Sequence, residues 1–278
     1  MSAAATTQAP YLFGYSEEES HRLRKQARLF NPSTRRLLQD AGVGPGMHVL
    51  DVGSGLGDVA LLAAELVGPS GAVVGIDTNP RSLDTARHRA HAAGLRNVSF
   101  RTGDIASLEL DEAFDALVGR CILFFLGDPS AVLRRLVGYV RSGGPIALQE
   151  PGNATLQPVA VPPSALLDQL WQWIMQTYRH AGLDLSMGLH LFQLFGEAGL
   201  PAPEMHLDAA VGGGPEWAGY DYMASLIRIL LPRIVQFGIA TPEQVGVDTL
   251  AERLRAEVVS QQGVVTTWSF ITAWARKP

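Results

Sequence analysis

The chain has 278 residues, of which 47% are hydrophobic and 18% are charged, so we expect a globular protein with a large core. A net charge of −5 argues against a nucleic-acid partner, which usually needs a basic surface. No apolar run reaches the roughly 20 residues of a membrane span, and a single cysteine excludes an internal disulfide. The first residues lack a secretory signal pattern, so we expect a cytoplasmic protein with no membrane partner.

Two helices are predicted before the first strand. In "SEEESHRLRKQARLF", Ser16 is a typical N-cap and three acidic residues follow in the first turn. A second helix is predicted in "NPSTRRLLQDAG", with Asn31 as its cap and Pro32 at its first position. Residues 1–45 are therefore expected to form an N-terminal helical cap.

Strands and helices then alternate over residues 46–150. The predicted strands are "MHVLDV", "AVVGID", "VSFRTGD", "FDALVGR" and "GPIALQE", and segments with helical patterns separate them. Apolar strands joined through helices indicate a parallel sheet that is covered on both faces, with right-handed crossovers. The pattern predicts an α/β class protein with a Rossmann-like, doubly wound core.

The alternation ends at Pro151. A proline-bearing connection leads into a predicted helical insertion, or lid, over residues 151–200. Residues 201–278 are expected to complete the sheet, ending with the strand "VVTTWSFITAWARKP", and to add substrate-side helices. The apolar helix around residues 226–231 could form a dimer surface, which leaves a homodimer open.

The loop in "HVLDVGSGLGDVA" carries Gly53, Gly55 and Gly57 directly after the first strand. Such a loop lets a ligand approach bare backbone at a helix N-terminus. The dinucleotide pattern has a last glycine where Asp58 stands here, and Asp51 and Asp58 would repel a pyrophosphate. The loop therefore indicates a cationic ligand without phosphates, from which Asp51 could accept a hydrogen bond. A tight turn that binds nothing is the alternative.

Two more acidic residues end the next strands. Asp77 stands where a carboxylate can accept both hydroxyls of a ribose, and Asn79 already supplies the helix cap that is the alternative role. Asp104 can accept from an exocyclic amine while Ile105 covers a base, or it can simply form a turn. Three consecutive parallel strands would bring these acids to one edge of the sheet.

Taken in order, "VLDVGSGLG", "VVGID", "FRTGDI" and "VRSGGPIALQEP" resemble the successive motifs of class I S-adenosylmethionine-dependent methyltransferases. The resemblance implies a seven-stranded sheet whose last strand is antiparallel. It also implies S-adenosylmethionine as cofactor and S-adenosylhomocysteine as its product. In that family the glycine loop passes under the methionine moiety, the acid after the second strand holds the ribose, and the acid after the third holds the adenine.

The opening "YLFGYSEEESHRLRKQARLF" resembles UbiE/ArsM-like bacterial small-molecule methyltransferases, in which the first helix closes over the cofactor. The resemblance suggests that Tyr15, Arg22 and Gln26 cap the methionine end, although Arg22 could equally lie on a solvated helix face. The cofactor-binding residues that we expect are Tyr15, Gln26, Asp51, Gly53, Ser54, Gly55, Gly57, Asp77, Thr78, Asp104, Ile105 and Arg120.

The expected acceptor is an apolar or aromatic small molecule, because aromatic residues gather where the family builds its lid. At helical spacing, however, such residues often belong to the core. The predicted substrate contacts are Tyr11, Trp173, Tyr178 and Tyr222. Methylation at carbon, nitrogen or oxygen stays open, and the resemblance suggests bacterial specialised metabolism, that is, natural product biosynthesis.

Glu150 and His180 are the candidate catalytic bases, although Glu150 could be a cap and His180 structural. No Asp/Asn cluster resembles a magnesium site, so no metal is expected. Two other functions remain open. A methyltransferase-like cyclase or pericyclase would use the cofactor without methyl transfer, and an NAD-dependent oxidoreductase is disfavoured by the glycine spacing.

Overall fold

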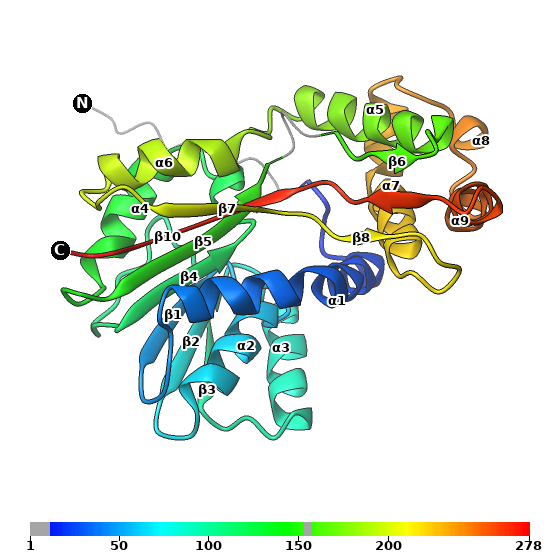
Figure 1. Cartoon of the computed structure of the whole chain (residues 1–278). Coiled ribbons are helices and arrows are strands. Elements are labelled where there is room, and N and C mark those ends of the chain that lie inside the picture. Colours follow the sequence, from blue (N-terminus) through cyan, green and yellow to red (C-terminus); the bar gives the residue numbers. More distant parts are fainter. Residues whose placement is uncertain (1–11, 153–156) are drawn as a thin grey trace.

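The computed structural model describes residues 12–152 and 157–278 (Figure 1). The helices are α1 (Glu17–Asp40), α2 (Asp58–Val67), α3 (Pro80–Ala92), α4 (Pro129–Gly138), α5 (Ala165–His180), α6 (Met187–Glu197), α7 (Gly219–Gln236), α8 (Pro242–Val245) and α9 (Leu250–Ser260), with a 3₁₀ helix at Leu123–Phe125. The strands are β1 (His48–Val52), β2 (Ala72–Asp77), β3 (Val98–Thr102), β4 (Ala116–Arg120), β5 (Pro145–Pro151), β6 (Ala160–Val161), β7 (Glu204–Asp208), β8 (Val211–Gly212), β9 (Val264–Thr266) and β10 (Phe270–Arg276).

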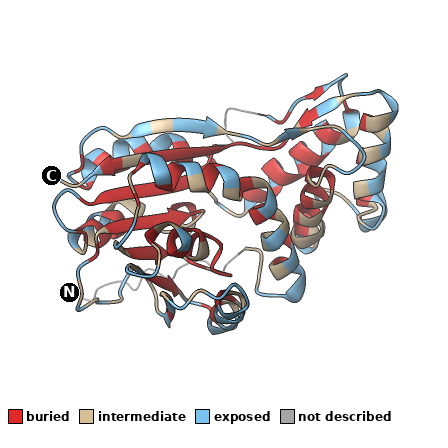
Figure 2. Cartoon of the chain, turned by 60° about the horizontal axis from the view of Figure 1, so that its bottom comes forward, coloured by how far each residue is buried: buried red, intermediate tan, exposed pale blue. Residues whose placement is uncertain are grey.

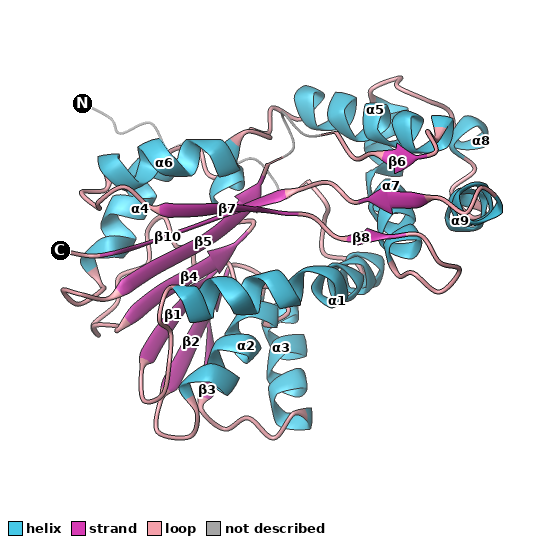
Figure 3. Ribbon diagram, viewed as in Figure 1, coloured by secondary structure: helices cyan, strands magenta, loops and turns pink. Residues whose placement is uncertain are grey.

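Seven of these strands form the central sheet, in the order β3-β2-β1-β4-β5-β10-β7 (Figure 3). The first five are mutually parallel, and β10 runs antiparallel to both β5 and β7. The prediction of a seven-stranded, Rossmann-like sheet with an antiparallel last strand is therefore confirmed. Because the parallel strands share one direction, the loops after β1, β2, β3 and β4 meet at one edge of the sheet.

The five inner strands of the sheet are buried on both faces, whereas the edge strands β3 and β7 are largely exposed (Figure 2). Side chains alternate along each strand, so Val49 belongs to the core that packs with α1, α2 and α3. The neighbouring Leu50 belongs to the opposite core, which contains residues of α4 and α6. Continuous apolar strands are the expected consequence of a sheet that is covered on both sides.

A second unit lies beyond the strand ends, at the right of Figure 1. It contains α5, α7 and α9 and a small antiparallel sheet in the order β6-β9-β8, around its own apolar core. The predicted insertion at 151–200 is divided between the two units: α5 packs against α7, whereas α6 packs against β5, β10 and α4. The predicted terminal strand is also divided, because β9 pairs in the small sheet and β10 in the central sheet.

The first helix differs from the prediction, because α1 continues through Asn31 and Pro32 without a break. Phe30 and Leu38 are 1% and 0% exposed and anchor the helix on both sides of the proline. Pro32 itself is exposed, so its ring meets solvent. Burial of the flanking residues outweighs the local preference of proline for a helix start.

Three residues of the helix that the sequence offers as a dimer surface are buried, and a homodimer stays a prediction. Leu226, Ile227 and Leu230 of α7 are 3%, 0% and 0% exposed because they face the core of their own chain. In the described residues, no helix is long and apolar enough to cross a membrane.

Replacing Pro32 by alanine should raise the free energy of unfolding by about 1–2 kcal/mol, because proline inside a helix removes a hydrogen bond and crowds the preceding turn. Pro80 is the matched control, since it occupies the first turn of α3, where proline fits. Urea denaturation of P32A, P80A and wild type measures both effects. Stabilisation by P80A but not by P32A would contradict a continuous α1.

Candidate cofactor and acceptor site

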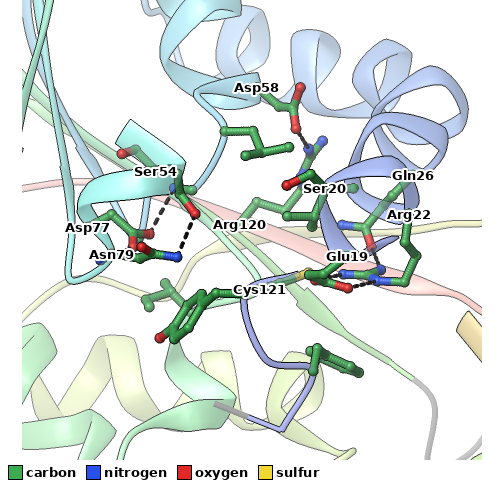
Figure 4. Close-up of a pocket in the computed structure, with 18 of the residues that line it drawn as sticks. Glu19, Ser20, Arg22, Gln26, Ser54, Asp58, Asp77, Asn79, Arg120 and Cys121 are labelled. Carbon is green, nitrogen blue, oxygen red and sulfur yellow. Dashed lines mark hydrogen bonds and ion pairs between the residues drawn. The ribbon is translucent and has the colours of Figure 1, made fainter. Parts of the chain in front are cut away.

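A cavity of about 700 Å³ lies at the carboxyl ends of β1, β2, β3 and β4. Its wall is completed by the first turns of α1, by α5 and α7, and by the segment that joins β9 to β10. Figure 4 shows how side chains from α1 and from the strand ends converge on this space. The size falls in the range of small-molecule sites, which is roughly 300–1,000 Å³.

The glycine loop divides into an exposed and a buried part. Gly53, Gly55 and Gly57 all have positive φ, at 69°, 50° and 82°, which favours glycine. A Cβ on Gly55 would meet no atom within 4 Å, and Gly55 faces the cavity. A Cβ on Gly57 would instead meet Ala86 at 3.0 Å, so Gly57 serves packing and does not reach the cavity.

Asp77 joins the glycine loop to the start of α3. Its Oδ2 accepts from the Gly55 N–H at 2.8 Å and its Oδ1 accepts from the Asn79 N–H at 2.8 Å (Figure 4). Burial raises the pKa of Asp77. Thr78 and Ser54 also line the cavity, and the buried Ser54 hydroxyl has no hydrogen-bond partner among the described residues.

The loop after β3 brings Asp104 and Ile105 to the same cavity. Asp104 Oδ1 accepts from the Ala106 N–H at 2.9 Å, which shapes the turn. Arg135 of α4 donates to the carbonyl oxygens of Ile105 and Leu108 and holds the loop against the core. Asp77 and Asp104 therefore lie together at one edge of the sheet, as the sequence predicts.

Asp51 lies behind the cavity wall and not in it. Its side chain is 0% exposed, and neither carboxyl oxygen has a hydrogen-bond partner among the described residues. Burial raises the pKa of Asp51 to about 8, although the charge of Arg120 opposes this shift. The carboxyl is therefore mostly protonated at neutral pH unless a cation lies nearby.

Arg120 ends β4 and points its side chain away from the sheet, between α1 and α2. Its Nη1 donates to Thr34 Oγ1 at 2.9 Å and to Asn31 Oδ1 at 3.1 Å, and its Nη2 lies 3.8 Å from an Asp58 oxygen. Asp58 also pairs with Arg89 at 2.6 Å. Arg120 lines the cavity and at the same time ties the cavity floor to two helices.

The first turns of α1 carry a buried polar network. The Arg22 guanidinium donates to both oxygens of Glu19 at 2.7 Å, and its Nη1 donates to Gln26 Oε1 at 2.7 Å. The Tyr222 hydroxyl donates to the same Gln26 oxygen at 3.3 Å and accepts from Trp268 Nε1 at 2.8 Å. Arg22 is only 4% exposed, so the alternative of a solvated helix face is wrong.

The predicted substrate residues have different positions. Tyr178 and Tyr222 line the cavity, and burial raises the pKa of both phenols. Trp173 is 6% exposed and packs in the core of the second unit, so the structure does not bring it to the cavity. Tyr11 lies outside the described residues.

The sequence did not single out Phe13, Glu19, Phe125 and Trp268, which also line the cavity. The Phe13 ring centroid lies 6.1 Å from that of Tyr178 and 5.9 Å from that of Phe125, both in edge-to-face contact. Two signals in the sequence mark Glu19, its capping-box spacing of three residues after Ser16 and its spacing of three residues before Arg22 on one helix face.

Neither candidate base lines the cavity. His180 is exposed at the end of α5, where its Nδ1 lies 2.8 Å from the Gln176 carbonyl oxygen and its ring stacks on Phe237. Glu150 is fully buried, and its Oε1 accepts from the N–H groups of Ile122 and Leu123. Among the described side chains, no three His, Cys, Asp or Glu residues are grouped so that they could hold a metal ion.

A glycine loop and two acids lie around one cavity, at the edge of a sheet with one antiparallel strand. This arrangement is typical of α/β proteins that bind a nucleoside at their strand ends. A family model described as a methyltransferase domain matches residues 44–182. Aklanonic acid methyltransferase DauC of Streptomyces sp. (strain C5) is 36% identical over 153 residues, which cover 52% of this chain and 70% of that protein. The chain therefore belongs to the class I S-adenosylmethionine-dependent methyltransferases.

Two further similarities agree with this family. Arsenite methyltransferase of Aquipseudomonas alcaligenes is 41% identical over 107 residues, but these cover 36% of this chain and only 31% of that protein. The solved structure of YcgJ from Bacillus subtilis has the same fold, with a TM-score of 0.56 at 17% identity over 89% of this chain and 98% of that one.

Gly55→Ala should weaken binding of S-adenosylhomocysteine about tenfold, because the new methyl group would point into the cavity and strain the loop. Gly94→Ala is the matched control, since Gly94 also has a positive φ of 71° and open space but lies far from the cavity. Calorimetric titration measures both affinities. Equal affinities for the two variants would contradict the position of Gly55 in the ligand site.

Asp51→Asn should change how stability depends on pH. The folded-state pKa of Asp51 is raised from 3.8 to about 8, so the wild type loses stability as the pH rises between these values. Asparagine does not titrate, and urea denaturation should therefore favour D51N increasingly from about pH 5 to about pH 8. A constant difference across this range would contradict a buried, protonated Asp51.

Proposed function

We propose that this protein transfers the methyl group of S-adenosylmethionine to an apolar or aromatic small molecule. The observation that carries the proposal is the composition of the cavity at the strand ends. Glycine-loop backbone and the acids Asp77 and Asp104 form one end, and aromatic rings from the segment before α1, from α5 and α7, and from the turn after β4 form the other. A cofactor and an acceptor can therefore meet in one continuous space.

The cofactor end fits S-adenosylmethionine. The open space at Gly55 admits a ligand against the backbone, and the unpartnered Ser54 hydroxyl offers a polar contact. Asp77 would accept the ribose hydroxyls with the lone pairs that its two backbone donors leave, and Asp104 with Ile105 would hold the adenine. When bound, the cofactor supplies an electrophilic methyl group on a sulfonium, and no metal is part of the proposal.

Phe13, Tyr178 and Tyr222 present apolar faces at the acceptor end. Tyr178 and Tyr222 are 6% and 1% exposed, so an acceptor that packs against them would be desolvated on entry. Holding a nucleophile in line with an electrophilic carbon can supply much of the rate in such a site. With Glu150 and His180 outside the cavity wall, we propose catalysis mainly by positioning.

The acceptor is proposed to be an organic molecule of the kind found in specialised metabolism. The name of DauC, which acts on aklanonic acid, supports this class. Cys121 is the one thiol in the chain, whereas trivalent arsenic is a soft centre that binds several thiolates. The aromatic wall therefore favours an organic acceptor over arsenite.

Asp77→Ala should lower the affinity for S-adenosylhomocysteine about tenfold or more, because it removes charge-assisted hydrogen bonds to the ribose. Asp84→Ala on the exposed face of α3, where the carboxylate pairs only with Arg87, is the matched control. Titration calorimetry gives both affinities.

Turnover is tested by incubating the wild type with S-adenosylmethionine and a panel of aromatic phenols, carboxylic acids and amines. Release of S-adenosylhomocysteine together with a methylated product supports the proposal. Conversion of an acceptor without that release would indicate a cyclase. Binding of NAD in preference to S-adenosylmethionine would overturn the proposed function.

A further inference from the structure

The turn after β4 contains a strained backbone at the junction of the two ends of the cavity. Cys121 has a φ of +56°, and Gln262 is the only other non-glycine residue with a positive φ among those described. Residues other than glycine, asparagine and aspartate rarely adopt this conformation unless the surroundings impose it. Something in the fold must therefore hold Cys121 in place.

Glu150 contacts the two residues that follow Cys121. Its Oε1 accepts from the Ile122 N–H at 2.9 Å and from the Leu123 N–H at 2.8 Å, which are the two amides directly after the strained residue. The Cys121 N–H is fixed from the other side, because it donates to the Gln149 carbonyl oxygen at 2.8 Å. Glu150 lies on β5 next to β4, is 0% exposed, and does not itself line the cavity.

The turn forms the floor between the cofactor and acceptor ends. Cys121 and Ile122 both line the cavity. A Cβ on Gly53 would come within 2.6 Å of Ile122 Cδ1, so Ile122 packs directly on the glycine loop. A shift of this turn would therefore move the glycine loop and the cavity floor together.

We propose that Glu150 is a positioning residue for the methyl-transfer site. By accepting from two consecutive amides it holds Cys121 in the left-handed conformation, and so sets the position of Cys121 and Ile122 against the bound cofactor. This inference rests on the proposed function. It also assigns a purpose to a fully buried carboxyl that contacts neither end of the cavity.

A positioning role and a general-base role predict different behaviour for the same substitutions. Glu150→Gln keeps an oxygen that can accept both amides, whereas Glu150→Ala removes it. Positioning therefore predicts that E150Q retains most of the cofactor affinity and turnover and that E150A loses about tenfold in affinity. A base would make E150Q as inactive as E150A while leaving cofactor affinity unchanged.

The decisive experiment places glycine at position 121 in the E150A background. Glycine adopts a positive φ without strain. E150A/C121G should therefore bind S-adenosylhomocysteine about threefold more tightly than E150A does. E150A/C121A removes the thiol but keeps the strain, and E150A/Q262G relieves strain at the other, distant position. Neither control should recover affinity.

Amide hydrogen exchange of the peptide over residues 121–125 gives a readout that needs no ligand. Exchange should be slow in the wild type and E150Q, and fast in both E150A and E150A/C121G, because only a side-chain oxygen at position 150 accepts from the Ile122 and Leu123 N–H groups. Circular dichroism melting confirms that each variant folds. Rescue by either control, no rescue by C121G, or unchanged exchange in E150A would overturn the positioning role. If the variants show the expected exchange rates but the wild type does not bind S-adenosylhomocysteine, the positioning role stands and the proposed function is overturned.

Discussion

The cavity depends on the buried hydrogen bonds that fix the middle of α1 to the central sheet. Thr34 Oγ1 lies 2.6 Å from Gln149 Oε1 and accepts from Arg120, and Gln149 Nε2 donates to Ser33 Oγ at 3.1 Å. Each of these groups is at most 9% exposed, so an unpaired one would cost about 1–3 kcal/mol. The helix cannot slide or rotate without breaking several pairs. Its N-terminal half, which carries Arg22, is thereby held over the strand ends.

We expect the buried acids to favour a cationic ligand over an anionic one. Asp58 is balanced by Arg89 and Arg120, whereas for Asp51 the effect of burial outweighs the opposing charge of Arg120. Burial raises the pKa of both Asp51 and Asp77, so each would be stabilised in its ionised form by a nearby cation. An anionic ligand would make both carboxylates less favourable. This electrostatic preference agrees with a sulfonium- and ammonium-bearing cofactor.

The part of the cavity that we propose for the cofactor could be predicted from the sequence because the residues that form it are near strand ends. Asp77 ends β2, and Gly55 and Asp104 lie within three residues of the ends of β1 and β3, so a parallel sheet brings all three to one edge. The acceptor end could not, because distant segments build it by packing. Tyr178 and Trp173 lie on one helix, but five residues turn them about 140° apart, so only one faces the cavity. His180 is about 160° from Tyr178 by the same geometry and faces solvent.

The prediction of a helix break at Pro32 was wrong, because the local preference of proline is weaker than the burial of Phe30 and Leu38.

The acceptor wall is joined across the chain by one line of hydrogen bonds. Trp268 donates to Tyr222, Tyr222 donates to Gln26, and Gln26 also accepts from Arg22, so three segments far apart in sequence share one network. Trp268 lies between β9 and β10, which belong to different sheets. A movement of the second unit relative to the central sheet would therefore strain this network. Removing one member of a buried network breaks more than one hydrogen bond, so the network resists such a movement. We therefore expect acceptor specificity to depend on the relative position of the two units as much as on any single aromatic side chain.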